Sequence, residues 1–521
     1  MMLEKTMVLE LVIRIVIWCV QLIIEIIYIP IFFLRLFKTP KKCPPIKNDL
    51  LLIRASELAR RIRKNQISSV AVVQAYISRI NEVNSLINAV IENRFPEALE
   101  DARRADDIVL HSGLNEEQLS EKYPLLGVPI TIKGSIAVAG LNHGAGRVDY
   151  QEKAKRDAVA VQKAKEAGAV VLLISNIPEL CLNWETTNKL IGTTANPYNT
   201  TRTPGGSSGG EASLLACGAS LMGIGSDICG SVRLPAHFCG VWGHKPTPYV
   251  ISTVGHRPDG LNKKRWCNYF TFGPMTRYAT DLRLLLSTIA EPNMKSMLEL
   301  HQSVDVKKIK LYYIQDLNCF HAKNFNKNVV TAFEKVVAHF DVVCQLECTK
   351  VTIPLMRNCA QLCFLSLLDV GKLNGMCEGE QIFEIFKFLT GQSKQAFNTV
   401  SLYMLRSVVP TVLSKFMKQV SRNLDKLRDD FIKILGDDGV FILPSHCSEA
   451  PYHNNVYRTV FDTAYLTIFN ALGFPATNCP VMFSPDGLPV GIQVVAAPNL
   501  DRLTLCVAEE IERAFGGWKF T

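Results

Sequence analysis

The sequence lacks the paired cysteine motifs that mark most small metal and redox sites. Its 521 residues include 16 cysteines, but none of them forms a CxxC unit and no zinc-finger spacing occurs. Scattered cysteines are most often buried free thiols in a reducing compartment. The sequence therefore predicts neither a disulfide framework nor a metal site.

Nucleotide-binding and nucleic-acid-binding signatures are missing as well. No G-x-x-x-x-G-K-[ST] sequence occurs, and Gly223-Ile224-Gly225 lacks the third glycine and the preceding strand of a dinucleotide fingerprint. No segment mixes basic and aromatic residues as RNA-binding modules do, and the formal net charge of +9 is spread along the chain. We expect no cofactor and no nucleic-acid partner, and a phosphate cradle remains the weaker interpretation of the glycine-rich region.

After residue 47 the chain shows no low-complexity linker and no internal repeat, so one large domain is the simplest organisation. Apolar residues at helical spacing cover 56–64, 69–83 and 158–167. Short apolar runs typical of buried strands cover 128–133, 169–175, 439–445 and 487–498. This alternation predicts an α/β fold. The segment 407–433 mixes aliphatic and basic residues, as does a helix lying on a membrane or a solvated helix over a core.

One long hydrophobic run is present, near the N-terminus. Residues 15–34 are apolar apart from Gln21, Glu25 and Pro30, and about 20 residues are needed to cross a bilayer. We expect a membrane anchor over 1–37, a basic proline-containing linker over 38–46 and the large domain over 47–521. Because Glu25 interrupts the run, a buried or interfacial helix is the alternative.

The orientation of this anchor follows from its flanking charges. Basic residues follow the run, and the positive-inside rule would place them and the large domain in the cytosol. Lys5 and Arg14 precede the run, and these two positive charges weaken the difference in charge between its two sides. We expect a single-pass protein of the endoplasmic reticulum or another intracellular membrane.

The stretch 204–240 is rich in glycine and serine and holds a single histidine, His237. Within it, 206–210 formally matches the nucleophile elbow G-x-S-x-G, but that motif requires an apolar strand directly before it. Loop-type residues 199–204 stand there instead, so we reject the elbow. Tight turns that need positive φ would explain one glycine pair, but not two glycine-serine clusters flanking the helix-like segment 211–221.

Serine hydrolysis without histidine uses more of these residues than any other interpretation. A serine hydroxyl attacks a carbonyl only if a base takes its proton, and a lysine is such a base only when neutral. Lys133 ends an apolar run and is followed by Gly134 and Ser135, a setting in which burial would lower its pKa. Ser207 and Ser231 are the candidate hydroxyls for a proton relay.

A run of backbone amides over 227–231 has the composition of an oxyanion hole. Little side-chain bulk surrounds Gly230, and each well-placed donor is worth about 3 kcal/mol to a developing oxyanion. Asp227 would hold this turn by accepting backbone N–H bonds, with Arg233 as its charge partner. An ordinary solvated ion pair is the alternative for these two residues.

These motifs together resemble the amidase signature family. The similarity extends over Leu50 to Trp518 and is strongest in Gly205-Gly206-Ser207-Ser208-Gly209-Gly210, in Gly225 to Arg233, in Gly243-His244-Lys245-Pro246 and in GVPITIK ending at Lys133. The resemblance implies the amidase signature fold, a large mixed β-sheet covered by helices on both faces, here with an N-terminal transmembrane helix. It also identifies 47–521 as the catalytic domain.

Within the family the chain looks most like the fatty-acid amide hydrolases of the second type. The resemblance implies a Ser-Ser-Lys triad. In it Ser231 is the nucleophile, Ser207, in a cis peptide linkage, relays the proton, and Lys133 is the base that later returns a proton to the leaving amine.

The same resemblance implies residues that surround the triad. The oxyanion donors would be the backbone amides of Ile228, Cys229, Gly230 and Ser231. The acyl channel would be bordered by Leu180, Cys181 and Leu182.

Two positions depart from the family pattern. Cys229 stands where relatives usually carry glycine, and if the position needs a positive φ, its β-carbon costs about 1 kcal/mol or more. Gly134 replaces the acidic residue that usually follows the lysine. Loss of that carboxylate would change how Lys133 is held.

The resemblance implies a membrane-anchored serine hydrolase. It would cleave fatty-acid amides, and some esters, to a free fatty acid and an amine through an acyl-enzyme. Its partners would be a lipid amide substrate and the membrane, and a homodimer is compatible with it. Two alternatives stay open: a general amidase on small soluble amides, and a catalytically impaired member that binds lipids or serves as a scaffold.

Overall fold

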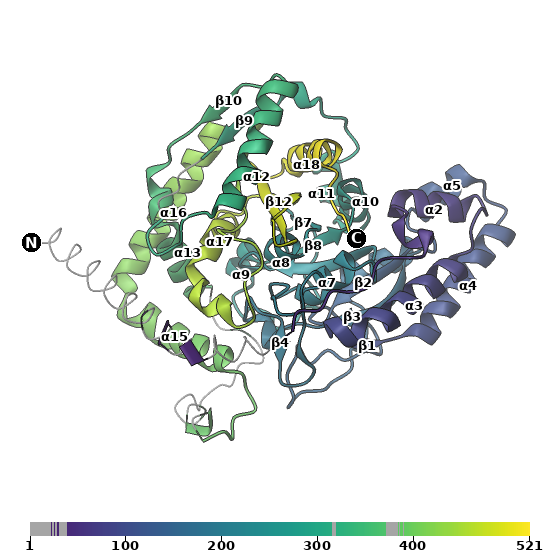
Figure 1. Ribbon diagram of the computed structural model, residues 1–521, viewed down its shortest axis with the longest axis horizontal. Coiled ribbons are helices and arrows are strands. Elements are labelled where there is room, and N and C mark those ends of the chain that lie inside the picture. The colour runs from purple at the N-terminus through teal and green to yellow at the C-terminus, as the bar shows by residue number, and fades with distance from the viewer. Residues whose placement is uncertain are drawn as a thin grey trace, which may run out of the picture.

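A large mixed β-sheet organises the chain in the computed structural model (Figure 1). The structure describes residues 22, 25, 26, 29, 30, 39–314, 319–370, 373, 384, 386–388 and 390–520. The strands of the sheet are β1 (Val90–Asn93), β2 (Pro129–Lys133), β3 (Val170–Ser175), β6 (Met222–Asp227), β7 (Trp242–Lys245), β8 (Thr271–Thr276), β9 (Lys310–Tyr313), β10 (Cys348–Lys350), β11 (Gly439–Pro444), β12 (Ala476–Phe483) and β13 (Pro489–Ala496).

The strand order mixes early and late parts of the chain. Across the described residues, eleven strands follow the order β1-β3-β2-β6-β8-β7-β12-β13-β11-β9-β10, and β4 (Thr187–Asn188) and β5 (Gly192–Thr193) form a separate pair. Strand β2 pairs in parallel with β3 and β6, whereas β8, β7, β12 and β13 are joined by antiparallel ladders. The predicted mixed sheet is therefore confirmed.

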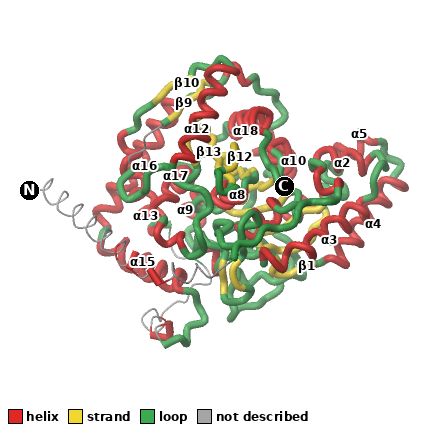
Figure 2. The backbone as a smooth tube through the Cα atoms, in the orientation of Figure 1, coloured by secondary structure: helices red, strands yellow, loops and turns green. Residues whose placement is uncertain are grey.

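Strand β11 shows that the sheet carries a core on each face. Val440 and Ile442 belong to the larger hydrophobic core, whereas Phe441 and Leu443 belong to a second core. Because successive side chains of a strand point to opposite faces, the two cores lie on opposite sides of the sheet. Strands such as β12 and β13 accordingly lie in the middle of the molecule with helices around them, whereas β9 and β10 lie at its edge (Figure 2).

The helices divide between these cores. Those of the larger core are α2 (Ala55–Arg63), α3 (Ser69–Ile87), α4 (Phe95–His111), α6 (Val159–Glu166), α9 (Lys263–Tyr269), α10 (Ala279–Ile289), α11 (Pro292–Leu298), α12 (Lys327–Ala338) and α18 (Asp501–Phe515). Those of the second core are α13 (Cys359–Leu368), α16 (Ser414–Leu435) and α17 (Ala464–Ala471). The remaining helices are α5 (Glu116–Lys122), α7 (Gly209–Ala216), which adds Leu214 to the larger core, α8 (Arg233–Cys239) and α15 (Phe397–Val412).

Several predicted elements are present with small shifts at their ends. Helices α2, α3 and α6 occupy the three segments with helical spacing, and β2, β3, β11 and β13 occupy the apolar runs. Helix α3 begins where the Ser68 side chain accepts a hydrogen bond from Ala71 N, and it ends at Asn88 in the left-handed region. These caps supply partners for backbone groups that a helix end leaves open.

Two predicted helical segments have different limits. The segment 211–221 is helical only within α7, because Gly218 adopts a φ of +78° and the chain then enters β6. A glycine in this conformation commonly ends a helix. The segment 407–433 is not one helix, since it is divided between α15 and α16 at Leu413, whose φ of −102° and ψ of 25° are not helical. Pro410, in the last turn of α15, precedes this break.

The predicted anchor falls largely outside the described residues, which include only Leu22, Glu25, Ile26, Ile29 and Pro30 of the apolar run. Among the helices that the structure does describe, none combines the length and the apolar character needed to cross a membrane.

The predicted linker is attached to the domain over its described part, 39–46. Cys43 is buried and its amide donates to Pro197 O at 3.0 Å. The Arg79 guanidinium donates to Pro44 O at 2.6 Å. The chain is thus held against the domain before residue 47.

Candidate active site

Lys133 is the last residue of β2, a strand whose five residues are all buried. Its Nζ lies 2.7 Å from Ser207 Oγ and 3.2 Å from Ser226 O. Burial lowers the pKa of Lys133 from its usual value, although three nearby groups oppose this shift (Cys181, Asp227 and Glu211). The environment therefore favours a neutral amine in contact with a serine hydroxyl.

Ser207 and Ser231 reach the site from two loops. Ser207 precedes α7 and follows Gly206 through a cis peptide bond, and Ser231 lies in the turn between β6 and α8. The Ser208 amide donates to Ser231 O at 3.2 Å and so joins the loops. Both hydroxyl-bearing residues line one cavity, and within the described contacts no hydrogen bond joins Ser207 Oγ to Ser231 Oγ.

Asp227 organises the turn that carries Ser231. Its two carboxylate oxygens accept Gly230 N at 2.7 Å and Val232 N at 3.0 Å. Arg233 donates to the same carboxylate at 3.2 Å, and both side chains are fully buried. Burial alone would raise the pKa of Asp227, but Arg233 and the Asn470 amide hold it well below its usual range. The alternative of a solvated surface ion pair is therefore wrong.

The amides of this turn are not equally available. The Gly230 amide already donates to Asp227, whereas the amides of Ile228, Cys229 and Ser231 have no hydrogen-bond partner in the described part of the chain. These three residues also line the cavity. Three of the four predicted oxyanion donors are thus free for a ligand in that cavity.

The structure accounts for the cysteine at position 229. The φ of Cys229 is not in the left-handed region, so the strain considered for its β-carbon does not arise. Gly230 has the positive φ, +87°, and a Cβ there would lie 2.8 Å from the Leu466 side chain. The turn therefore requires glycine at 230 and accepts a side chain at 229.

The structure also accounts for the glycine at position 134. A Cβ at Gly134 would lie 2.5 Å from Ile91 Cδ1 and 2.6 Å from Ser175 O. No side chain fits there without moving a backbone carbonyl. In this chain the Gly134 amide donates to Ser175 O at 3.0 Å, and Lys133 is held by hydroxyl and carbonyl oxygens.

The cavity beside the serines has a volume of about 320 Å³ and mainly apolar walls. The three residues predicted to border the acyl channel, Leu180, Cys181 and Leu182, all line it. Much of its wall also comes from α13, α15, α9 and the segment 456–461, including Phe364, Leu367, Phe397, Leu402, Leu405, Val460 and Phe461. The sequence interpretation had assigned none of these to the site.

His256 is a second residue that sequence reasoning missed. Its Nδ1 lies 2.7 Å from Pro258 O, so this nitrogen carries the hydrogen and Nε2 accepts from the Ser226 hydroxyl at 3.2 Å. Burial, followed by the nearby Lys133, holds the pKa of His256 well below its usual range. A neutral imidazole therefore accepts a hydrogen bond from Ser226, the residue whose backbone carbonyl accepts from Lys133. No motif surrounds His256 that could have predicted this position.

Arg406 places a guanidinium on the cavity wall, where burial lowers its pKa to about 10. It donates to Leu367 O at 3.2 Å. It lies one residue before the basic segment recognised in the sequence, and only the path of α15 brings it to the cavity.

The chain can now be compared with known proteins. The family model described as Amidase matches residues 71–505, a range that contains the buried lysine and both serines. The chain belongs to the amidase signature family. This amidase is 36% identical over 500 residues to human fatty-acid amide hydrolase 2, with 92% of each chain covered.

Two further comparisons agree with this assignment. The amidase is 39% identical over 496 residues to fatty-acid amide hydrolase 2-B of Danio rerio, covering 92% of this chain and 93% of the relative. It is also similar to a solved structure of a fatty acid amide hydrolase, with a TM-score of 0.72 and 21% identity, covering 90% of this chain and 86% of the other. The latter likeness shows the shared fold.

Proposed function

We propose that this amidase hydrolyses amides of long-chain fatty acids, and some esters, through an acyl-enzyme at Ser231. One observation carries the proposal: a buried lysine contacts Ser207 at the wall of an apolar cavity that Ser231 also lines. The human and Danio rerio relatives named fatty-acid amide hydrolase 2 and 2-B support this substrate class.

In the proposed first step, Ser231 Oγ attacks the carbonyl carbon of the amide. Ser207 accepts the proton of Ser231 and passes its own proton to the neutral Nζ of Lys133, so the charge gained by the lysine balances that of the oxyanion. The 2.7 Å contact between Nζ and Ser207 Oγ supports this path. Ser231 Oγ must approach Ser207 as substrate binds, because catalytic hydrogen bonds often form only in the complex.

The amides of Ile228, Cys229 and Ser231 would bind the oxyanion. Each well-placed donor contributes about 3 kcal/mol to stabilising the transition state. The Gly230 amide, which already donates to Asp227, instead keeps the turn in shape. To act as a direct oxyanion donor, as predicted, the Gly230 amide would have to donate to Asp227 and to the oxyanion at the same time.

The second half of the reaction reverses the proton path. The protonated Lys133 returns a proton through Ser207 to the leaving nitrogen, and the C–N bond breaks to release the amine. Water then attacks the acyl-enzyme, its proton follows the same route, and the fatty acid leaves with Ser231 restored.

The shape of the site supports a fatty acyl group over a small soluble amide. The cavity has a volume of about 320 Å³ and mainly apolar walls, so a hydrocarbon chain that enters it is removed from water and binds favourably. The two departures that favoured a non-catalytic member also have structural accounts, since Cys229 is unstrained and Gly134 fills a place with no room for a side chain.

We also propose that the N-terminal apolar segment attaches the amidase to an intracellular membrane, with the catalytic domain in the cytosol. Glu25 pairs with Arg458 at 2.5 Å, and Arg458 lies between cavity residues Tyr457 and Val460. This contact brings the segment to the domain beside the cavity. Phe397 and Leu405 line the cavity and are also exposed, which supports entry of a lipid from the same side.

Fluorophosphonate labelling of the full chain tests the assignment. Ser231→Ala should abolish labelling and reduce amide hydrolysis by more than about 10⁴-fold. Lys133→Met should reduce hydrolysis by about 10² to 10⁴-fold, because it removes the base and retains the packing. Ser208→Ala is the matched control from the same buried loop and should retain both activities. Labelling that persists in a folded Ser231→Ala variant would contradict the proposal.

A further inference from the structure

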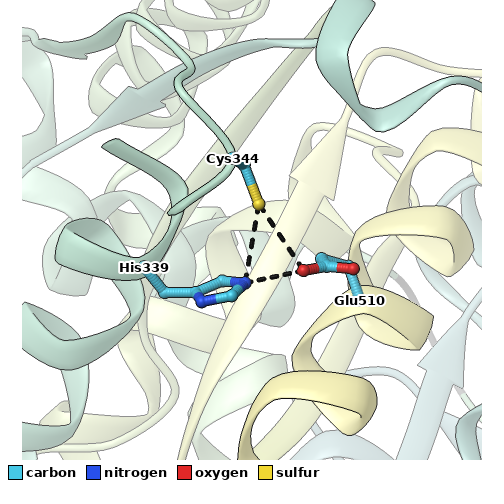
Figure 3. Close-up of side chains that lie close together, drawn as sticks. All are labelled: His339, Cys344 and Glu510. Atoms are coloured by element: carbon cyan, nitrogen blue, oxygen red, sulfur yellow. Dashed lines mark hydrogen bonds and ion pairs between the residues drawn. The ribbon is translucent and has the colours of Figure 1, made fainter. Parts of the chain in front are cut away.

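Three side chains of metal-binding type meet outside the cavity: His339, Cys344 and Glu510 (Figure 3). His339 Nε2 lies 2.6 Å from Glu510 Oε1, and Cys344 Sγ lies 3.5 Å from each of these two atoms. His339 and Glu510 are 11% exposed and Cys344 is 9% exposed, so the cluster is sheltered but open to ions from solvent. None of the three lines the active-site cavity.

The local fold brings the first two side chains together. His339 to Val343 form a π-helical turn directly after α12, and Cys344 N donates to His339 O across five residues at 3.1 Å. In an α-helix, residues five apart would point about 140° away from each other. The wider turn places imidazole and thiol on one side, and such turns are frequent at functional sites.

The separations match one geometry in particular. Zinc binds sulfur at about 2.3 Å and nitrogen or oxygen at about 2.0–2.2 Å, so tetrahedral coordination places sulfur about 3.5 Å from either atom. Both distances from Cys344 Sγ are 3.5 Å. The nitrogen and oxygen, now 2.6 Å apart, would have to separate by roughly 0.7 Å to accept the ion between them.

We propose that His339, Cys344 and Glu510 bind a divalent transition-metal ion, zinc above others, with a water at the fourth position. Mixed nitrogen, sulfur and carboxylate ligands suit zinc, whereas magnesium and calcium prefer oxygen ligands alone. The cysteine spacings predicted no metal site, because these ligands come from segments 166 residues apart at Cys344 and Glu510.

Binding must displace protons and one competing cation. Zinc takes the thiolate of Cys344, whose proton is released to solvent. It also takes the Nε2 lone pair of His339, so the hydrogen that Nε2 shares with Glu510 must move to Nδ1 or to solvent. Arg513 donates to both oxygens of Glu510, at 2.7 Å and 2.6 Å, so zinc competes with the guanidinium for Oε1 while Oε2 can keep its partner. Because the ion displaces protons from its ligands, zinc uptake should weaken as pH falls.

A second cluster, His446, Cys447 and Asp462, is less suitable. It is completely buried, and Cys447 Sγ already donates to Asp462 Oδ2 at 3.1 Å. Asp462 Oδ1 accepts the Lys323 amide at 2.7 Å. An ion there would have to replace the hydrogen bond between Cys447 and Asp462 Oδ2 and cross the protein interior.

The proposed zinc would connect two helices that both pack on β13. His339 and Cys344 follow α12, and Glu510 belongs to α18. An ion bound to the folded chain alone stabilises it in proportion to the logarithm of its free concentration. We therefore infer a structural rather than a catalytic role for this site.

Zinc content of the purified full chain tests the site. After dialysis against zinc and then against buffer, the wild type should retain one equivalent by elemental analysis, and zinc should raise its Tm. Cys344→Ser and His339→Gln should weaken binding by more than the roughly 10- to 100-fold typical of losing an outer-shell partner. Cys348→Ser is the matched control, since its sulfur faces Val337 O at 3.8 Å and lies outside the cluster.

One further variant should strengthen zinc binding where the ligand variants weaken it. Arg513→Gln removes the competing cation and should tighten zinc binding, whereas a simple ion pair without metal affinity predicts no zinc in either form. Equal zinc content in the wild type and Cys344→Ser, or equal loss in Cys348→Ser, would overturn the proposal. Fluorophosphonate labelling should be unchanged in all these variants, so this test is independent of the proposed hydrolysis.

Discussion

Lys133 has two hydrogen-bond partners among the described residues, Ser207 Oγ and Ser226 O, and neither is a carboxylate. A buried ammonium without an ionised partner in direct contact is costly, so burial lowers the pKa of Lys133 and makes its proton easier to remove. The imidazole of His256, held neutral by burial, adds no second positive charge beside the amine. The chemistry proposed for the site thus begins with the desolvation of a single side chain.

Hydrolysis should rise with pH through the lowered pKa of Lys133. Below that pKa the amine carries a proton and cannot accept another, and above it the base is available. Burial places the midpoint below the value of about 10.4 for a solvated lysine. The measurement is kcat/KM against pH with a short soluble amide, which avoids effects of pH on lipid.

A substitution of Glu211, a carboxyl group near Lys133, tests whether the lysine determines this pH profile. The Glu211 charge raises the pKa of Lys133, while burial raises the pKa of Glu211 itself to about 7. Glu211→Gln should therefore move the midpoint to lower pH, since it removes a negative charge near the amine. A profile that falls as pH rises through this range would contradict a lysine base.

The sequence allowed the three candidate catalytic residues to be predicted, because each belongs to a short motif with its own local chemistry. Lys133 ends an apolar strand, and the serines lie in glycine-rich loops. His256 and Arg406 could not be found in this way. They reach the cavity only through tertiary folding, and their neighbours along the chain carry no corresponding signal.

At the scale of elements, α15 forms one wall of the cavity. Phe397, Leu402, Leu405 and Arg406 line the cavity from this helix. Leu405 is 39% exposed and Phe397 is 58% exposed, so both also border its opening. An acyl chain that fills the cavity would therefore contact α15 along its length.

Leu402→Trp should shift preference towards shorter acyl chains. The larger ring would occupy volume that a long chain needs, and turnover of a long-chain amide should fall about tenfold or more relative to a short-chain one. Met404→Trp is the control, because Met404 lies on the same helix, is 38% exposed and does not line the cavity. Equal effects of the two substitutions on both substrates would contradict an acyl channel along α15.

Elements were predictable where one physical signal dominated. The buried strands β2 and β11 are continuous apolar runs between polar segments. The end of α7 and the break at Leu413 were not predictable from periodicity, because they depend on the backbone conformations of Gly218 and Leu413. Periodicity indicates that a segment is helical but does not locate its end.

At the scale of the whole molecule, the described part of the chain carries two candidate sites of different character. The apolar cavity lies among α13, α15 and α9, while the proposed zinc ligands lie on α18 and after α12. Glu25 meets the domain at Arg458, on the side of the cavity. Membrane attachment and substrate entry would thus share one side of the protein.

Glu25→Leu tests this arrangement in the full chain. It removes a charge from the apolar segment, so retention on membranes during carbonate extraction should be at least as strong as in the wild type. It also breaks the pair with Arg458, so turnover of a long-chain amide in vesicles should fall while that of a short soluble amide does not. Glu121→Leu, an exposed glutamate on α5, should change neither value. Release of the wild type by carbonate would contradict stable membrane attachment through this segment.

The position of β12 has a consequence for the synthesis of this protein. His244 of β7 pairs with Thr477 of β12, 233 residues later in the chain. At a translation rate of 5–20 residues per second, roughly 10–50 s pass between the two. During that time β7 has an open edge in the middle of the future sheet, where another nascent chain could pair. Ribosome-bound chaperones would therefore have to shield it until the last strands emerge.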